Sequence, residues 1–119
     1  MKGVYDGVTI HHLKNMANEL VVWDTVKNIS SIVNLIITTY RRTNYISKLY
    51  KQQLRNKIEE YMILEKLHSA GIIAQNNIYQ IEKTMRLINN LELEGIAYSF
   101  AIDQLETLNK KLQRLLEDF

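Results

Sequence analysis

The chain has no cysteine and no proline in its 119 residues, and it has only four glycines. Without cysteine, the protein can form no disulfide framework, no zinc ribbon and no thiol nucleophile. Proline and glycine are the strongest helix breakers, and both are missing from residues 8–70 and 72–94. These absences favour long helices, and they favour a reducing compartment.

Motifs of catalysis, metal binding and membrane insertion are also missing. The sequence contains no phosphate-binding G-x4-G-K-[ST] loop, no G-x-S-x-G elbow and no H-E-x-x-H zinc motif. His11 and His12 are adjacent, so on a helix they point about 100° apart and cannot both bind one metal. No apolar run approaches the roughly 18 residues of a membrane span, and none follows Lys2 as in a secretory signal. We expect a cytoplasmic protein that is not an enzyme, with no metal, no cofactor and no membrane partner.

Apolar residues recur at three-to-four spacing along most of the chain. One stripe covers Ile10 to Trp23, and another runs from Ile46 to Leu67 behind a helix cap expected at Thr43 or Asn44. Residues 29–40 are β-branched and apolar almost all round, which suits a strand or a buried helix. We expect helix there, because no partner strand is visible. The pattern predicts one all-α domain over residues 1–119, a compact bundle of four or five helices with residues 1–8 as a flexible lead.

The last third of the chain contains a repeat with a period of 24 residues. Aligning Gly71 with Gly95 also matches Leu67 with Leu91, Ile72 with Ile96, Ile78 with Ile102, Gln80 with Gln104 and Glu82 with Glu106. The shared pattern is a helix end, a glycine turn and a new amphipathic helix. It predicts that the C-terminal part consists of two related helix-turn-helix hairpins, with helices near 75–92 and 98–118.

The last predicted helix carries apolar residues at heptad spacing. The positions that could contact a partner helix or a second copy of the chain are Leu105, Leu108, Leu112, Leu115 and Phe119. Ile102 and Leu116 widen the stripe beyond a two-stranded seam, which favours packing inside a bundle. Intramolecular core and homo-oligomer interface both remain open, and core is the preferred interpretation.

Positive charge is concentrated in the middle of the chain. Between Asp24 and Glu59 there is no acidic residue, while seven basic residues occur, including Lys27. The six that we predict to bind nucleic acid or an acidic partner are Arg41, Arg42, Lys48, Lys51, Arg55 and Lys57. Arg41, Lys48 and Arg55 are seven residues apart, which puts them on one stripe if the helix is continuous. Such a stripe suits phosphate binding, the docking of an acidic partner, or an ordinary solvated helix face.

The stretch AGIIAQNNIYQIEKTMR, residues 70–86, includes Ala70, Gly71, Ile72, Gln75, Ile78, Ile81, Glu82 and Lys83. In this order the residues resemble the turn and recognition helix of the repressor-type helix-turn-helix family. The resemblance implies a motif over residues 62–86, with four side chains at the major groove of DNA: Gln75, Asn76, Asn77 and Gln80. A plain helical hairpin accounts for the same residues, because the second copy of the repeat shares the glycine, isoleucine, glutamine and glutamate.

The composition is rich in isoleucine, asparagine, lysine and tyrosine, as AT-rich coding sequence produces, and this points to a phage, a virus or another mobile element. We therefore hold two hypotheses. The first is an accessory or regulatory interaction module that docks on a partner protein or on itself. The alternative is a nucleic-acid-binding protein that uses the basic stretch 27–57, with or without the helix-turn-helix.

Overall fold

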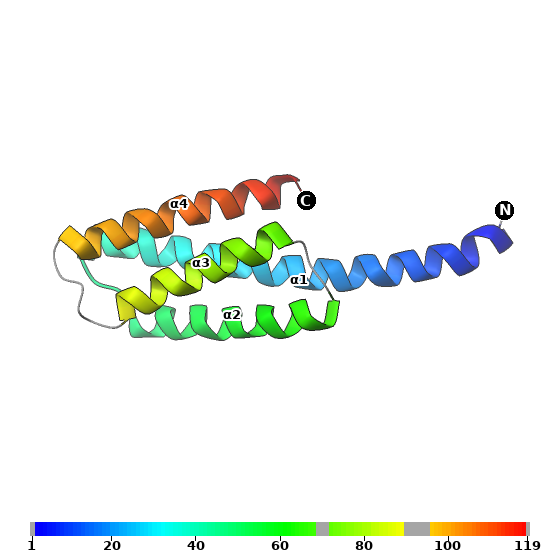
Figure 1. Ribbon diagram of the computed structural model, residues 1–119, viewed down its shortest axis with the longest axis horizontal. Helices are drawn as coiled ribbons and strands as arrows, with labels where there is room; N and C mark the ends of the chain where they lie inside the picture. The colour runs from blue at the N-terminus through cyan, green and yellow to red at the C-terminus, as the bar shows by residue number, and fades with distance from the viewer. Residues whose placement is uncertain (1, 69–71, 90–95, 119) are drawn as a thin grey trace.

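Four α-helices make up the computed structural model of the chain. It describes the backbone of residues 2–68, 72–89 and 96–118, and the side chains of residues 20–67, 75–88 and 99–118. The helices are α1 (Lys2–Thr43), α2 (Lys48–His68), α3 (Ile72–Asn89) and α4 (Ile96–Asp118), and the described residues contain no strand. The predicted all-α bundle is confirmed, including the helix over residues 29–40 (Figure 1).

Helix α1 is 42 residues long and joins two stretches that the sequence analysis treated separately. The segment between them, residues 24–28, contains no proline or glycine, so nothing ends the helix there. The helix also begins at Lys2, so residues 2–8 of the predicted lead are helical. The described residues therefore form four helices.

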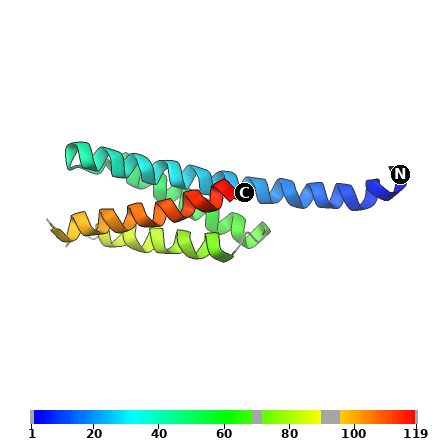
Figure 2. The same ribbon diagram turned by 90° about the horizontal axis from the view of Figure 1, so that it is seen from above.

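Consecutive helices run in opposite directions along one long axis (Figures 1 and 2). Helix α1 packs on α2 and on α4, helix α3 packs on α4, and the contact between α2 and α3 is the smallest of the four. The N-terminal part of α1, blue in both views, projects past the ends of the other three helices. This projection makes the molecule elongated, with extents of 64, 23 and 22 Å.

The core forms where the apolar stripes of the four helices meet. In α1 the buried residues Val22, Val26, Ile29, Val33 and Ile36 alternate steps of four and three, which keeps them on one face. The other helices contribute Leu54, Ile58, Tyr61, Ile78, Ile81, Met85, Ile88, Ala101, Ile102, Leu105, Leu108 and Leu112. Leu105, Leu108 and Leu112 are thus intramolecular core, as the preferred interpretation of the last helix had it.

The turn between α1 and α2 has a left-handed residue at its start. Asn44 has a φ of 58°, and its backbone N–H donates to the carbonyl of Tyr40 at 2.7 Å. Asparagine tolerates this conformation better than most residues, so it ends α1 rather than capping α2. Helix α2 starts from Ser47, whose carbonyl accepts from the Lys51 N–H at 3.1 Å. Ile46, in the turn, is buried in the core.

The two copies of the repeat occupy equivalent environments. Ile78 and Ile102 are both buried, and Gln80 and Gln104 are both exposed. The paired acidic residues form the same one-turn ion pair, Glu82 with Arg86 and Glu106 with Lys110. Each copy is a helix end followed by a new helix, as predicted, while Gly71 and Gly95 lie outside the described residues.

Candidate functional site

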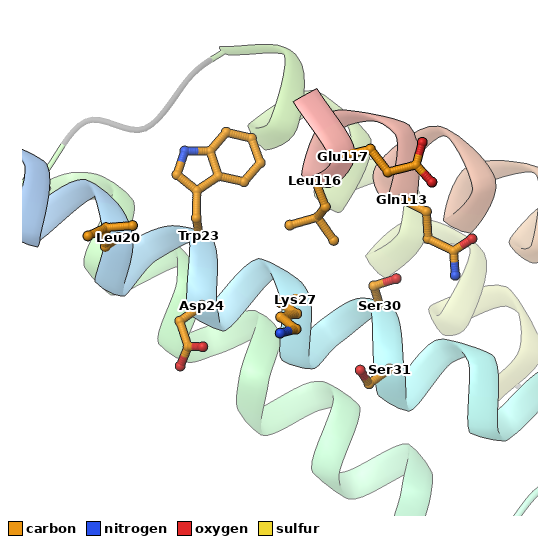
Figure 3. A pocket seen from close by; sticks show the side chains of 9 residues that line it. All are labelled: Leu20, Trp23, Asp24, Lys27, Ser30, Ser31, Gln113, Leu116 and Glu117. Atoms are coloured by element: carbon orange, nitrogen blue, oxygen red, sulfur yellow. The ribbon is translucent and has the colours of Figure 1, made fainter. Parts of the chain in front are cut away.

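An open groove lies between α1 and α4, at the point where α1 leaves the bundle (Figure 3). It has a volume of about 550 Å³ and is lined by Leu20, Trp23, Asp24, Lys27, Ser30, Ser31, Gln113, Leu116 and Glu117. In Figure 3, Trp23 from α1 and Leu116 from α4 both project into the space between the two helices. Charged side chains stand around these apolar groups, and the groove follows the direction of α1.

The floor of this groove is fixed by a buried hydrogen bond. The Ser30 hydroxyl donates to Asn109 Oδ1 at 2.9 Å, which ties α1 to α4 in the interior. Trp23 and Leu116 are half-buried and pack against the core beside it. The backbone of the groove is therefore held in place without a bound ligand.

Apolar side chains remain open to solvent at the outer end of the groove. Leu20 is 51% exposed and Val21 is 50% exposed, although both belong to the helix that supplies the largest share of the core. Beyond them, α1 continues as the projecting segment Lys2–Glu19, and no other described helix lies beside it (Figures 1 and 2). The rise of an α-helix makes this segment about 27 Å long.

The sequence alone does not reveal this groove. Leu20 and Trp23 belong to the stripe of the first predicted helix and Leu116 to the last helix, and nothing in the sequence aligns the two helices. The signal that was available is the continuation of the first stripe from Ile10 to Trp23 without a break. Where that stripe leaves the bundle is set by where α4 ends against α1.

The structure divides the predicted basic stretch between two helices. Arg41 and Arg42 lie in the last turn of α1, whereas Lys48, Lys51 and Arg55 lie on α2, after the turn. The single stripe through Arg41, Lys48 and Arg55 is therefore wrong, because the chain reverses direction between residues 44 and 47.

Two of the six predicted basic residues are engaged in ion pairs. Arg41 Nη2 lies 3.1 Å from Asp103 and also contacts Glu106, both on α4, and Lys57 lies 3.0 Å from Glu60. The Lys110 ammonium, 3.2 Å from Glu106, lowers the pKa of that carboxyl most. Partial desolvation raises the pKa, and Arg41 lowers it further. Arg41 thus serves as a bridge between α1 and α4.

The other four cations, Arg42, Lys48, Lys51 and Arg55, make no ion pair within the part of the chain that the structure describes. Lys51 and Arg55 face a second, smaller groove of about 180 Å³ between α2 and α3. Arg86 from α3 joins them there, beside Glu59 and Glu82. The groove therefore mixes both signs of charge, and Arg86 is a member that the sequence analysis did not include.

The four predicted base-reading residues have different environments. Asn77 is only 7% exposed, and its side-chain amide donates to the Leu108 carbonyl at 3.0 Å, so its assignment to a DNA groove is wrong. Gln75 donates to the Tyr79 hydroxyl at 3.0 Å, while Asn76 and Gln80 are exposed. Helices α2 and α3 lie lengthwise in the bundle (Figure 1), unlike the steeply crossed pair of a helix-turn-helix.

The predicted partner-contacting stripe of the last helix is mostly inside the bundle. Leu105 and Leu112 are fully buried, Leu108 is nearly so, and Leu115 is half-buried. Phe119 lies outside the described residues. Core packing therefore accounts for Leu105, Leu108 and Leu112.

The length and apolarity of Leu20–Thr43 in α1 would allow these 24 residues to cross a membrane. In the bundle the same residues form the central core helix, with Val22, Val26 and Ile29 fully buried, and core helices of this kind meet the same criteria. The absence of a membrane partner stays a prediction. Among the residues described, no group of three or more histidine, aspartate or glutamate side chains could hold a metal ion.

Comparisons of the chain with known protein families, with curated protein sequences and with solved structures find no match.

Proposed function

We propose that this chain is a non-enzymatic helical module that docks or oligomerises on a partner protein through the α1–α4 groove and the projecting part of α1. The observation that carries the proposal is that α1 extends beyond the rest of the bundle while Leu20 and Val21, at the base of the extension, stay half exposed. Burial of an apolar side chain of this size contributes about 1.5–3 kcal/mol. Because both side chains are already about half buried, a partner that covers them gains about 1.5–3 kcal/mol in total.

The shape of the site favours a protein over a small molecule. The groove is open along its length and continues into a helix that projects about 27 Å. Small-molecule sites enclose most of their ligand, whereas amphipathic helices dock lengthwise into open apolar grooves. The AT-rich composition supports an accessory or regulatory role in a phage, virus or other mobile element, acting in the cytoplasm.

Site-specific photo-crosslinking in the source cell tests this proposal. A photoreactive amino acid in place of Leu20 should give one discrete covalent adduct, because the partner lies against that position. The same amino acid in place of Gln104, an exposed residue of α4 away from the groove, is the matched control and should give none. Adducts at both positions, or at neither, would show that the groove is not a docking surface.

Nucleic-acid binding is the second candidate function, and the four cations without a described ion pair favour it. Arg42, Lys48 and Arg55 are exposed around the α1–α2 turn, where they are able to contact phosphates. Arg41 and Lys57 contribute less, since acidic neighbours already neutralise them. The binding would carry little sequence choice, because phosphate contacts do not read bases.

Salt dependence and charge reversal test this second candidate. Binding of a labelled oligonucleotide should weaken steeply from low to high salt. It should disappear when Arg42, Lys48 and Arg55 are replaced together by glutamate, and the exposed Lys83→Glu on α3 is the control. If the wild-type chain binds neither duplex nor single strands in low salt, this candidate is excluded.

A further inference from the structure

We propose that the partner is a second copy of this chain, and that the α1 helices of two copies pack antiparallel so that each extension lies in the α1–α4 groove of the other. This inference rests on the proposed function, since it names the occupant of the same surface. Four observations support it: the weak helix propensity of the extension, its length relative to the groove, the charges along α1, and the direction of the pairing.

The extension has little reason to be helical by itself. It contains Gly3 and Gly7 and the β-branched Val4, Val8 and Thr9, all of which are poor helix formers. An unpacked helix of such a sequence is marginal in water, because helices in proteins take most of their stability from a buried apolar face. The extension is nevertheless continuous with α1, which favours a surface outside this bundle that covers it.

The extension, Lys2–Glu19, is longer than the groove and can span it. On α1 the groove spans Leu20 to Ser31, which is twelve residues. A two-fold axis between Met16 and Ala17 puts Lys2 to Leu13 of the second copy opposite that span. The extension of one copy then fills the α1 side of the other copy's groove from end to end.

The charges along α1 agree with this register. Asp6, Leu13, Leu20 and Lys27 are seven residues apart, and seven-residue spacing keeps positions on one row of a helix. Leu20 and Lys27 line the groove. In an antiparallel second copy the row runs in the opposite direction. Asp6 of one copy then lies opposite Lys27 of the other, and Leu13 lies opposite Leu20. Two-fold symmetry repeats each pair, so the interface contains two unlike-charge pairs and two leucine pairs.

Parallel pairing lacks these advantages. In a parallel, in-register pair every residue of the row meets its own copy, so Lys27 faces Lys27 and Asp6 faces Asp6. Like charges at such positions are unfavourable. A parallel pair also leaves each groove without an extension, because both extensions then project from the same end. The row therefore selects the antiparallel arrangement.

Solution mass tests the dimer with the full chain. Light scattering should give twice the 14.0 kDa of one chain. Leu13→Asp should raise the dissociation constant of the dimer at least tenfold without loss of bundle helicity. Ile63→Asp, which replaces an equally apolar but exposed residue of α2 outside the interface, should leave the dissociation constant unchanged. Asp6→Lys alone should weaken the dimer, and adding Lys27→Asp should restore it.

Disulfide crosslinking tests the direction, and the chain is suited to it because it has no cysteine. An equimolar mixture of Leu13→Cys and Leu20→Cys chains should form a crosslinked dimer upon oxidation, whereas each variant alone should not. Met16→Cys should crosslink with itself. Crosslinking of Leu13→Cys chains with each other would establish a parallel pair and overturn the inference.

A wild-type chain that stays monomeric at all concentrations would also overturn the inference, but not the proposed function. In that case an adduct of a different mass at position 20 identifies another protein as the partner. If position 20 gives no adduct at all, the docking surface itself is wrong. The two failures are therefore distinguishable.

Discussion

Asn76 and Asn77 are neighbours in α3 with opposite environments. Asn76 is exposed, whereas Asn77 is buried and donates to the carbonyl of Leu108 on α4. Helix propensity and hydrophobic pattern treat the two residues alike, so only packing separates them. The bond satisfies the buried side-chain amide of Asn77 and joins the two helices of the second repeat copy.

We predict that Asn77→Ala lowers the free energy of unfolding by about 1 kcal/mol, because it removes a buried hydrogen bond between α3 and α4. Asn76→Ala is the matched control and should change it by less than about 0.5 kcal/mol, as is usual for surface positions. Urea denaturation followed by circular dichroism measures both values. Equal effects of the two substitutions would contradict the role of the buried hydrogen bond.

Glu106 gives the protein a predictable response to acid. Its pKa is lowered in the folded chain, chiefly by Lys110 and further by Arg41. A carboxyl of this kind stabilises the fold at pH values above its unfolded-state pKa of about 4.3, and the stabilisation is lost as pH falls through the folded-state value. We predict that the free energy of unfolding of Glu106→Gln falls less steeply than that of wild type as the pH drops below about 5. Thermal denaturation across this pH range checks it, and an unchanged slope would argue against the assignment.

At the scale of elements, the turn between α1 and α2 determines the direction of the second helix. Asn44 takes a left-handed backbone conformation, and the reversal that follows it separates Arg41 from Lys48 and Arg55. A continuous helix through this region would have produced the single basic stripe that the spacing suggested. The distribution of these basic side chains over the surface thus depends on the left-handed conformation of Asn44.

We predict that Asn44→Ala lowers the free energy of unfolding by about 1 kcal/mol, because alanine at positive φ keeps the strain of a Cβ but lacks the short polar side chain that lets asparagine adopt this conformation. Asn44→Gly should be neutral within a few tenths of a kcal/mol, as glycine reaches this conformation freely. Chemical denaturation of the two variants beside wild type makes the comparison. The backbone explanation fails if alanine and glycine are equally well tolerated.

The molecule as a whole has one core to which all four helices contribute. Trp23, the single tryptophan, lies between α1 and α4, so its fluorescence reports on that interface, while far-ultraviolet circular dichroism reports on every helix. A single core implies that these two signals change together.

We predict one unfolding transition with coincident midpoints by fluorescence and circular dichroism. For the wild-type chain the midpoint should rise with protein concentration, since association stabilises the folded state by mass action. For Leu13→Asp the midpoint should not depend on concentration. Separated midpoints would instead indicate that α1 and the C-terminal hairpin unfold independently.

The sequence by itself determined the helical class, the approximate limits of α2, α3 and α4, and most of the core. The scarcity of proline and glycine left helix as the only regular structure for stripes such as Ile78, Ile81, Met85 and Ile88. These properties are local, because helix formation and the apolar face depend on residues three or four positions apart. The repeat was equally accessible, since equivalent residues occupy equivalent environments.

Only the tertiary structure decided which of the remaining residues are free to act. Arg41 is paired because Asp103 and Glu106 lie across from it on α4. Asn77 is buried because it lies against α4, where it donates to the Leu108 carbonyl. Leu20 is half exposed because α4 ends beside it while α1 continues. Each outcome depends on how far one helix extends along another, and that alignment is fixed by contacts between residues distant in the chain, which no spacing within a single helix encodes.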